Sequence, residues 1–119
     1  MSTCTSPSQR NYESPTLNMK GFKVGFTYSD FVIFQNNDRT EKDINTDTFA
    51  FVITNAAGTI VETLTLGAGL TIEGLGKLIW LIGTDTTGTA GIYTYELIWT
   101  QSDTGAVSPA LVGRIIVEA

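Results

Sequence analysis

The sequence predicts an all-β fold, an antiparallel sandwich of about eight strands, on the evidence of three features. Apolar and polar side chains alternate with period two in several segments, as they do in strands with one buried face. No window of about twelve residues repeats its apolar positions with the helical period of 3.6. The 19 threonines and 12 glycines suit strands separated by many turns.

The N-terminal part predicts an arm followed by two strands. Residues 1–19 are rich in Ser, Thr, Pro, Asn and Gln, which indicates an extended arm that a partner would order. Alternation then predicts a strand over 20–28, with a break or bulge at Ser29–Asp30 and a second short strand over 31–35. The polar residues 36–43 follow as a solvated loop. We therefore expect a domain of residues 20–119 behind an arm of residues 1–19.

The middle of the chain predicts a hairpin and two further strands. Alternating segments at 48–54 and 59–66 flank Asn55-Ala56-Ala57-Gly58, a connection of hairpin length that ends in glycine. Beyond Gly67-Ala68-Gly69, the pattern predicts strands at 70–72 and 77–82 and a corner rich in Thr and Gly at 85–91.

The last third of the chain indicates which kind of sandwich this is. In the strand predicted over 91–99, Tyr93 and Tyr95 share a face with Leu97 and Trp99, and a turn at 102–105 leads to a closing strand at 111–117. Gly91-x-Tyr93-x-Tyr95 is typical of the tyrosine corner of immunoglobulin-like sandwiches, with Tyr95 at the position of the cysteine in antibody domains. We expect Gly91, Tyr93 and Tyr95 to define the fold.

Composition argues against an enzyme. The chain has no histidine and one cysteine, Cys4, so it cannot form an internal disulfide, the common transition-metal sites or a Ser-His or Cys-His nucleophile pair. Asp30, Glu73, Asp85 and Asp103 are all placed at predicted turns, where solvated acids are ordinary and a glycosidase pair is not expected. We predict no catalytic residues, cofactor or metal.

Charge and hydropathy limit the partners. The net charge is -5 and the seven basic residues are scattered, which disfavours nucleic acid. No apolar run approaches the roughly 18 residues of a membrane span, and the first residues lack a signal-peptide pattern. We expect a soluble protein made in the cytosol.

Three motifs imitate ligand sites. Asp43-Ile44-Asn45-Thr46-Asp47 opens like a calcium loop but lacks the required glycine and the final glutamate, so we expect a solvated loop there. The glycine clusters at 67–69 and 74–76 do not complete a phosphate loop. Trp80 and Trp99 could stack on sugars, although their strand parity favours the core.

Three apolar residues are predicted to point away from the core. Leu78, Trp80 and Ile82 share the core parity of their strand, so Ile79 and Leu81 face outward, and Ile98 shares a face with Thr94 and Glu96. Left bare, such side chains favour aggregation. We interpret Ile79, Leu81 and Ile98 as interface candidates, with cover by a loop or the arm as the alternative.

The order of these segments resembles the immunoglobulin-like modules of tailed-bacteriophage virion proteins, which occur in head-fibre and decoration proteins and at the N-terminus of baseplate upper proteins. The resemblance covers residues 21–118 and follows the hairpin at 55–58, Leu70-Thr71-Ile72-Glu73-Gly74, Gly76-Lys77-Leu78-Ile79-Trp80, the tyrosine strand and the closing strand. The sequence departs from these modules at 78–82, which is apolar on both faces.

The resemblance implies a structural virion protein made in the bacterial host cytoplasm. It would attach to capsid or tail proteins through its arm and its outward apolar residues, and we expect a homo-oligomer. A head decoration or head-fibre role is favoured over a baseplate or tail adaptor, because one module and an arm leave no region for a receptor-binding tip. A carbohydrate-binding module that contacts a host-surface glycan is the alternative from a different class.

Overall fold

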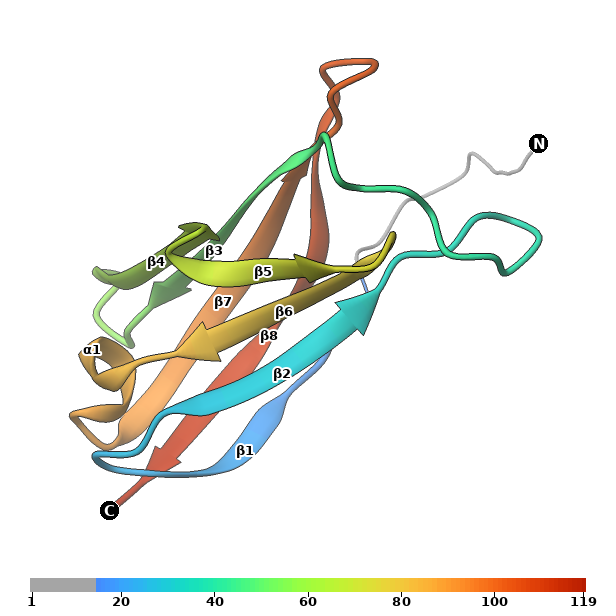
Figure 1. Cartoon of the computed structure of the whole chain (residues 1–119). Coiled ribbons are helices and arrows are strands. Elements are labelled where there is room, and N and C mark those ends of the chain that lie inside the picture. Colours follow the sequence, from blue (N-terminus) through green and yellow to red (C-terminus); the bar gives the residue numbers. More distant parts are fainter. Residues whose placement is uncertain (1–14) are drawn as a thin grey trace.

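The computed structural model describes residues 15–119 as eight strands and one short helix (Figure 1). Cys4 and most of the predicted arm, residues 1–14, lie outside the described residues. The elements in chain order are β1 (Met19–Lys23), β2 (Tyr28–Ile33), β3 (Thr48–Thr54), β4 (Ile60–Leu66), β5 (Gly69–Glu73), β6 (Lys77–Ile82), α1 (Thr84–Thr87), β7 (Gly91–Thr100) and β8 (Val107–Glu118).

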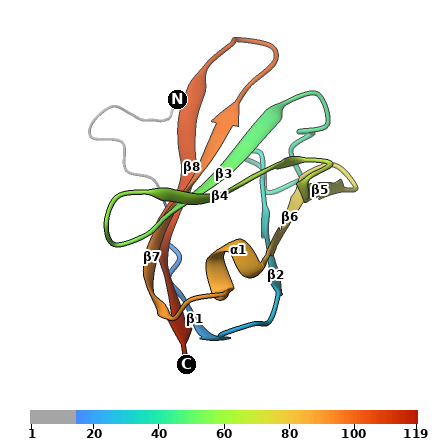
Figure 2. The same ribbon diagram turned by 90° about the vertical axis from the view of Figure 1, so that its left-hand side faces the viewer.

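The strands form two layers that face each other across the core. One layer has the order β1-β8-β7-β3-β4 and the other the order β5-β6-β2, and a short parallel pairing of β4 with β5 joins them. Neighbours within each layer are antiparallel except β1 and β8, which are parallel. Figure 2 shows the two layers edge-on, with α1 between them at one end.

Most predicted elements are confirmed. β3 and β6 have the predicted bounds, and β4, β5 and β7 differ from prediction by one or two residues. The hairpin turn closes as expected, because Asn55 N–H donates to Thr59 O and Gly58 adopts a φ of +88°. β8 begins earlier than predicted, at Val107, and the corner before β7 contains the four-residue helix α1.

The predicted strand at 20–28 is wrong, because a turn divides it. β1 ends at Lys23, Gly25 has a φ of +90°, and Phe26 N–H donates to Lys23 O. β2 then begins at Tyr28 and passes through Ser29–Asp30 without the predicted break. The alternation of apolar and polar residues continues through this turn by coincidence. The pattern alone therefore does not indicate where the chain crosses from one sheet to the other.

The core lies between the sheets and is rich in aromatic side chains. Trp80, Phe51 and Tyr95 form a stack at its centre, with ring centroids 5.1 Å and 4.8 Å apart. Trp80 is fully buried, and its indole N–H has no acceptor among the described residues. The alternation predicted for the strands is confirmed by the full core, which comprises Met19, Phe22, Ile44, Phe49, Phe51, Ile53, Leu64, Leu70, Leu78, Trp80, Ile82, Tyr93, Tyr95, Leu97, Leu111, Ile115 and Val117.

Residues 15–18, assigned to the arm by composition, lie along β8. Leu17 N–H donates to Val112 O, and Val112 N–H donates to Pro15 O. The Tyr95 hydroxyl donates to Leu17 O at 2.6 Å, and burial together with the charge of Asp30 raises the pKa of this hydroxyl, which keeps it protonated. Met19 and Phe22 in β1 are buried. The described part of the predicted arm is therefore packed against the sandwich.

The α1 corner is fixed by a carboxylate from the neighbouring sheet edge. Glu62 on β4 accepts hydrogen bonds from the Thr86 hydroxyl at 2.6 Å and from Gly83 N–H at 3.0 Å. The Thr87 hydroxyl donates to Phe26 O at 2.6 Å. Both threonines are fully buried, so these bonds satisfy their hydroxyl groups. The corner before β7 is thus held by both β4 and the β1–β2 turn.

The tyrosine corner identifies the sandwich as immunoglobulin-like. The Tyr93 hydroxyl donates to Thr89 O, four residues upstream, at 2.6 Å. Tyr95, two residues later, is buried against Phe51 at the position that carries cysteine in antibody domains. Gly91 begins β7 with a φ of +156°. Together with the strand order, these features make the protein an immunoglobulin-like β-sandwich that has aromatic stacking in place of the disulfide.

Replacing Tyr93 with phenylalanine should lower the free energy of unfolding by about 1–2 kcal/mol, because Thr89 O loses its partly buried donor. Urea denaturation measures the difference. Tyr28→Phe is a matched control, since its hydroxyl accepts an exposed hydrogen bond from Lys23 N–H, and this change should cost less. Equal effects of the two substitutions would contradict the special role of Tyr93.

Candidate docking surface

The outer surface of the β5-β6-β2 sheet carries four apolar side chains, which we call the apolar face: Phe31, Ile33, Ile79 and Leu81. Phe31 is paired with Ile79 across β2 and β6, and Ile33 and Leu81 have the same outward parity. Phe31, Ile33 and Leu81 remain 47%, 44% and 49% exposed, and Ile79 is partly exposed. Figure 1 looks directly onto this sheet. These side chains are therefore accessible to a partner in the part of the chain that the structure describes.

One charged pair borders the apolar face. The Lys77 ammonium lies 4.4 Å from the centre of the Phe31 ring and 3.2 Å from the Glu73 carboxylate. Lys77 is directly opposite Ile33 on β2 and Glu73 on β5. The pair holds the Phe31 ring from one side and leaves the rest of the face apolar. The surface therefore has a polar border at one end, as docking surfaces commonly do.

The edge of this sheet is protected against simple strand addition. β2 is the terminal strand, and Asp30 has inward parity opposite the buried Trp80. The Asp30 carboxylate accepts a hydrogen bond from Phe31 N–H at 2.8 Å. An inward charge on an edge strand opposes pairing with another strand. The edge of β2 is therefore a poor template for strand addition.

The structure divides the three interface candidates between opposite sides of the molecule. Ile79 and Leu81 belong to the apolar face, whereas Ile98 lies on the outer surface of the other sheet, between Ala50 on β3 and Pro109 on β8. Ile98 is partly buried there. A single partner surface cannot cover all three residues, so Ile98 belongs to a second surface.

Sequence reasoning missed half of the apolar face. The sequence predicts a short strand that contains Phe31 and Ile33 after a break, but it does not assign these residues to the inner or the outer surface of the sheet. The available signal was the alternation of Tyr28, Asp30 and Val32 with Ser29, Phe31 and Ile33, but Asp30 has the parity of the core residues. A charge at that position makes the parity ambiguous, and only the pairing with β6 resolves it.

Neither tryptophan presents a free ring surface to a sugar. Trp80 is fully buried against Phe51. Trp99 is partly buried, lies against Phe34 with centroids 4.9 Å apart, and donates its indole N–H to Asp47 at 2.8 Å. The core placement predicted for both is therefore confirmed for Trp80, whereas Trp99 is partly buried and packs against the core.

Like Ile44, Asp47 is buried, although the segment 43–47 is predicted to be a solvated loop. Asp47 is 7% exposed and also accepts hydrogen bonds from the Ser102 N–H at 3.0 Å and the Ser102 hydroxyl at 3.1 Å. Burial raises the pKa of its carboxyl, but the hydrogen bonds from Ser102 and Trp99 outweigh burial and leave the pKa below its ordinary value. Asp47 therefore joins the start of β3 to the β7–β8 turn.

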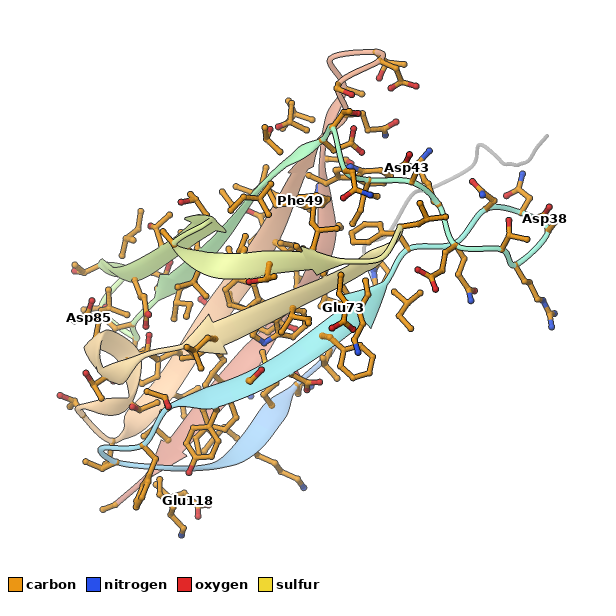
Figure 3. The ribbon with its side chains drawn as sticks, in the orientation of Figure 1. Asp38, Asp43, Phe49, Glu73, Asp85 and Glu118 are labelled. Atoms are coloured by element: carbon orange, nitrogen blue, oxygen red, sulfur yellow. The ribbon has the colours of Figure 1, made fainter. Side chains whose placement is uncertain are left out.

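The other carboxylates do not converge. Asp43 accepts hydrogen bonds from the Asn45 backbone and side chain, and these bonds lower its pKa. Figure 3 shows Asp43, Glu73 and Asp85 on separate parts of the chain. Within residues 15–119, no three His, Cys, Asp or Glu side chains gather where they could hold a metal ion. Helix α1, at four residues, is far too short to span a membrane.

Comparison with known proteins finds distant similarities among solved structures. No protein-family model and no curated protein matches the chain. Among solved structures it is similar to the NK cell receptor Nkp44, a triggering partner in natural cytotoxicity, with 12% identity, a TM-score of 0.44 and coverage of 90% of this chain and 100% of that one. It is also similar to the RIG-5 IG1 homodimer, with 13% identity, a TM-score of 0.43 and coverage of 92% and 95%. Because the sequence identities and TM-scores of both structures are low, the fold assignment rests on the strand order and the tyrosine corner of this chain.

Proposed function

We propose that this protein is a non-enzymatic structural subunit that docks onto another protein through its apolar face. The observation that carries the proposal is the cluster of Phe31, Ile33, Ile79 and Leu81 on the outside of a sheet whose inside is already a complete core. Burial of a side chain of this kind stabilises a contact by roughly 1.5–3 kcal/mol when it is complete, and about half of that remains available for the half-exposed ones.

The more specific proposal is a virion protein of a tailed phage, a head decoration or head-fibre component. Its support is the order of strands and turns over residues 21–118, which resembles the immunoglobulin-like modules of such particles. Apolar residues on opposite sheets, Leu81 on one and Ile98 on the other, suit a subunit with neighbours on both sides. In this proposal residues 2–14 add a further attachment.

The double substitution Phe31→Thr with Leu81→Glu should weaken docking while the domain stays folded. Threonine keeps strand propensity, and neither side chain contributes to the core. We expect binding at least about tenfold weaker, since a loss of 1.4 kcal/mol suffices for that factor. The measurement is gold-labelled antibody on particles from the source, viewed by electron microscopy: the wild-type protein should label the head, and the variant should leave particles unlabelled.

Val107→Thr is the matched control. Val107 is 65% exposed on β8, away from the apolar face, so its substitution removes a comparable apolar group and should leave labelling unchanged. Normal labelling by the double variant would overturn the docking proposal. Labelling at the tail tip would replace the head assignment with a baseplate role, and wild-type protein found only free in the lysate would overturn the virion assignment.

A further inference from the structure

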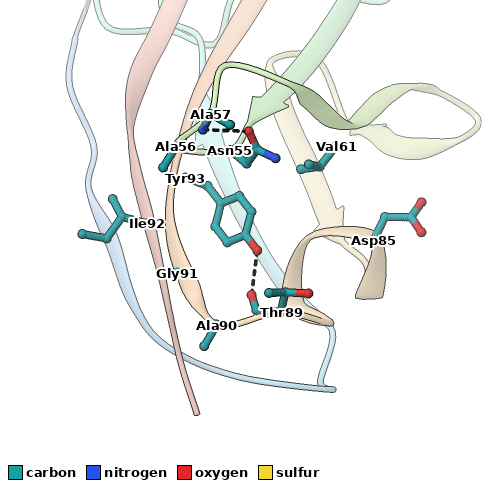
Figure 4. A pocket seen from close by; sticks show the side chains of 10 residues that line it. All are labelled: Asn55, Ala56, Ala57, Val61, Asp85, Thr89, Ala90, Gly91, Ile92 and Tyr93. Atoms are coloured by element: carbon teal, nitrogen blue, oxygen red, sulfur yellow. Dashed lines mark hydrogen bonds between the residues drawn. The ribbon is translucent and has the colours of Figure 1, made fainter.

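A pocket of about 320 Å³ opens at the end of the sandwich that contains α1. Its walls come from the β3–β4 turn with Asn55, Ala56 and Ala57, from Val61 on β4, and from the corner that runs from Asp85 in α1 to Tyr93 in β7 (Figure 4). No residue of the apolar face lines it. The pocket is therefore separate from the docking surface, and the proposed function makes no use of it.

The walls are held rigidly by bonds already made within the domain. Asn55 Oδ1 accepts hydrogen bonds from Ala57 N–H at 3.0 Å and Thr59 N–H at 2.9 Å. The Tyr93 hydroxyl is held by Thr89 O in the tyrosine corner. Ala56, Ala57 and Ala90 are small, which keeps the opening clear. A preformed pocket loses little conformational entropy when a ligand binds.

Two polar groups at the pocket have no partner within the part of the chain that the structure describes. Because Asn55 Oδ1 accepts two backbone N–H groups, its amide nitrogen is identified as the other branch. Figure 4 shows this nitrogen directed toward Val61 and the space beside the Tyr93 ring. Neither the nitrogen nor the Asp85 carboxylate has a hydrogen-bond or ion-pair partner within residues 15–119. Asp85 lies on the opposite rim, where Figure 4 shows its exposed carboxylate directed away from Asn55 and Tyr93, so it must change rotamer to face a ligand.

A donor and an acceptor on opposite sides of an apolar floor match the chemistry of a sugar ring. Each sugar hydroxyl both donates and accepts, so neighbouring hydroxyls can accept from Asn55 Nδ2 and donate to the Asp85 carboxylate. The C–H face of the ring can lie on the partly exposed Val61, beside the small part of the Tyr93 edge that is not buried. The volume is at the small end of the range of about 300–1,000 Å³ for ligand pockets, which suits one sugar unit.

We propose that this pocket binds a single neutral sugar unit of a glycan. The carboxylate of Asp85 and the net charge of -5 select against acidic sugars, because a uronate or sialate would place like charges together. The proposal is independent of docking through the apolar face, and either can fail without the other. It also replaces the tryptophans as the sugar-contacting residues with Asn55 and Asp85.

The test is a titration of the full chain, labelled with ¹⁵N, with glucose, galactose, N-acetylglucosamine and glucuronate, followed by NMR. At least one neutral sugar should give saturable shifts in the millimolar range at Ala57, Thr89 and Gly91, and glucuronate should bind several-fold more weakly. Asp85→Asn should weaken the neutral sugar about threefold to tenfold and reduce the discrimination against glucuronate. Ala57→Leu should block binding by filling the opening.

Asp103→Asn provides the matched control, because Asp103 is an exposed acid in the β7–β8 turn and does not line the pocket. It should bind sugar like the wild type. The proposal is overturned if no neutral sugar shifts the pocket resonances at roughly tens of millimolar, if the shifts map elsewhere, if glucuronate binds equally well, or if Asp85→Asn has the same affinity as Asp103→Asn.

Discussion

Replacement of Gly113 by alanine should detach residues 15–18 from β8 and lower the free energy of unfolding by about 3 kcal/mol. A Cβ atom at this position would lie 2.0 Å from Leu17 O, a backbone atom that cannot move away alone. Leu17 O is also the acceptor for the buried Tyr95 hydroxyl. The added methyl group therefore breaks the hydrogen bonds to Val112 and leaves the Tyr95 hydroxyl without its acceptor.

Urea denaturation gives the size of this loss, and amide hydrogen exchange at Leu17 and Val112 locates it. Tyr95→Phe separates the two causes, because it removes the hydroxyl without adding a clash and should cost only about 1 kcal/mol. Exchange at Leu17 should become fast in Gly113→Ala and remain protected in Tyr95→Phe. Unchanged protection in Gly113→Ala would mean that the close approach of Leu17 to β8 is not made in solution.

Asp47→Ala, at the other end of the sandwich, should also lower the free energy of unfolding by about 3 kcal/mol. The substitution leaves the Trp99 indole N–H and the Ser102 N–H without acceptors in a largely buried setting, and each such loss costs roughly 1–3 kcal/mol. Thermal and urea denaturation measure the difference. Asp43→Ala is the matched control, because that carboxylate is exposed and bonds only within its own turn, so its substitution should have a small effect.

The lowered pKa of Asp47 gives this contribution a defined pH dependence. The folded state releases the Asp47 proton at a lower pH than the unfolded chain does, so the unfolded state binds more protons between the two pKa values. The stabilisation is complete above the unfolded value of about 3.9 and is lost as pH falls through the folded value. The wild type should therefore lose more stability below about pH 4 than Asp47→Asn, and identical acid profiles would contradict this.

The sequence predicts the strands well wherever two signals coincide. β3, β4 and β7 combine period-two alternation with glycine-containing turns at their ends, and all three appear within one or two residues of the predicted bounds. β6 is apolar on both faces, and it also has the predicted bounds. The tyrosine corner was predictable because its geometry depends on a short local spacing, from Thr89 to Tyr93.

Three features of the structure were not predictable from the sequence, because each depends on contacts between segments that are distant in the chain. The packing of Leu17 requires Gly113 on another strand, and the composition of residues 15–18 gave no sign of it. The burial of Asp47 depends on Ser102, 55 positions away. The grouping of Phe31 and Ile33 with Ile79 and Leu81 follows from the pairing of β2 with β6, since alternation indicates that a strand has two sides but not which strands are neighbours.

The parallel pairing of β1 with β8 has a mechanical consequence. Met19 is opposite Ile115 and Lys23 is opposite Glu118, so the two strands run side by side in the same direction. A force that pulls the chain before Met19 away from its C-terminus slides β1 along β8, and the hydrogen bonds of the pair share the load instead of breaking one after another. The β1–β8 pairing thus gives the domain mechanical resistance when its N-terminal segment and its C-terminus are pulled apart.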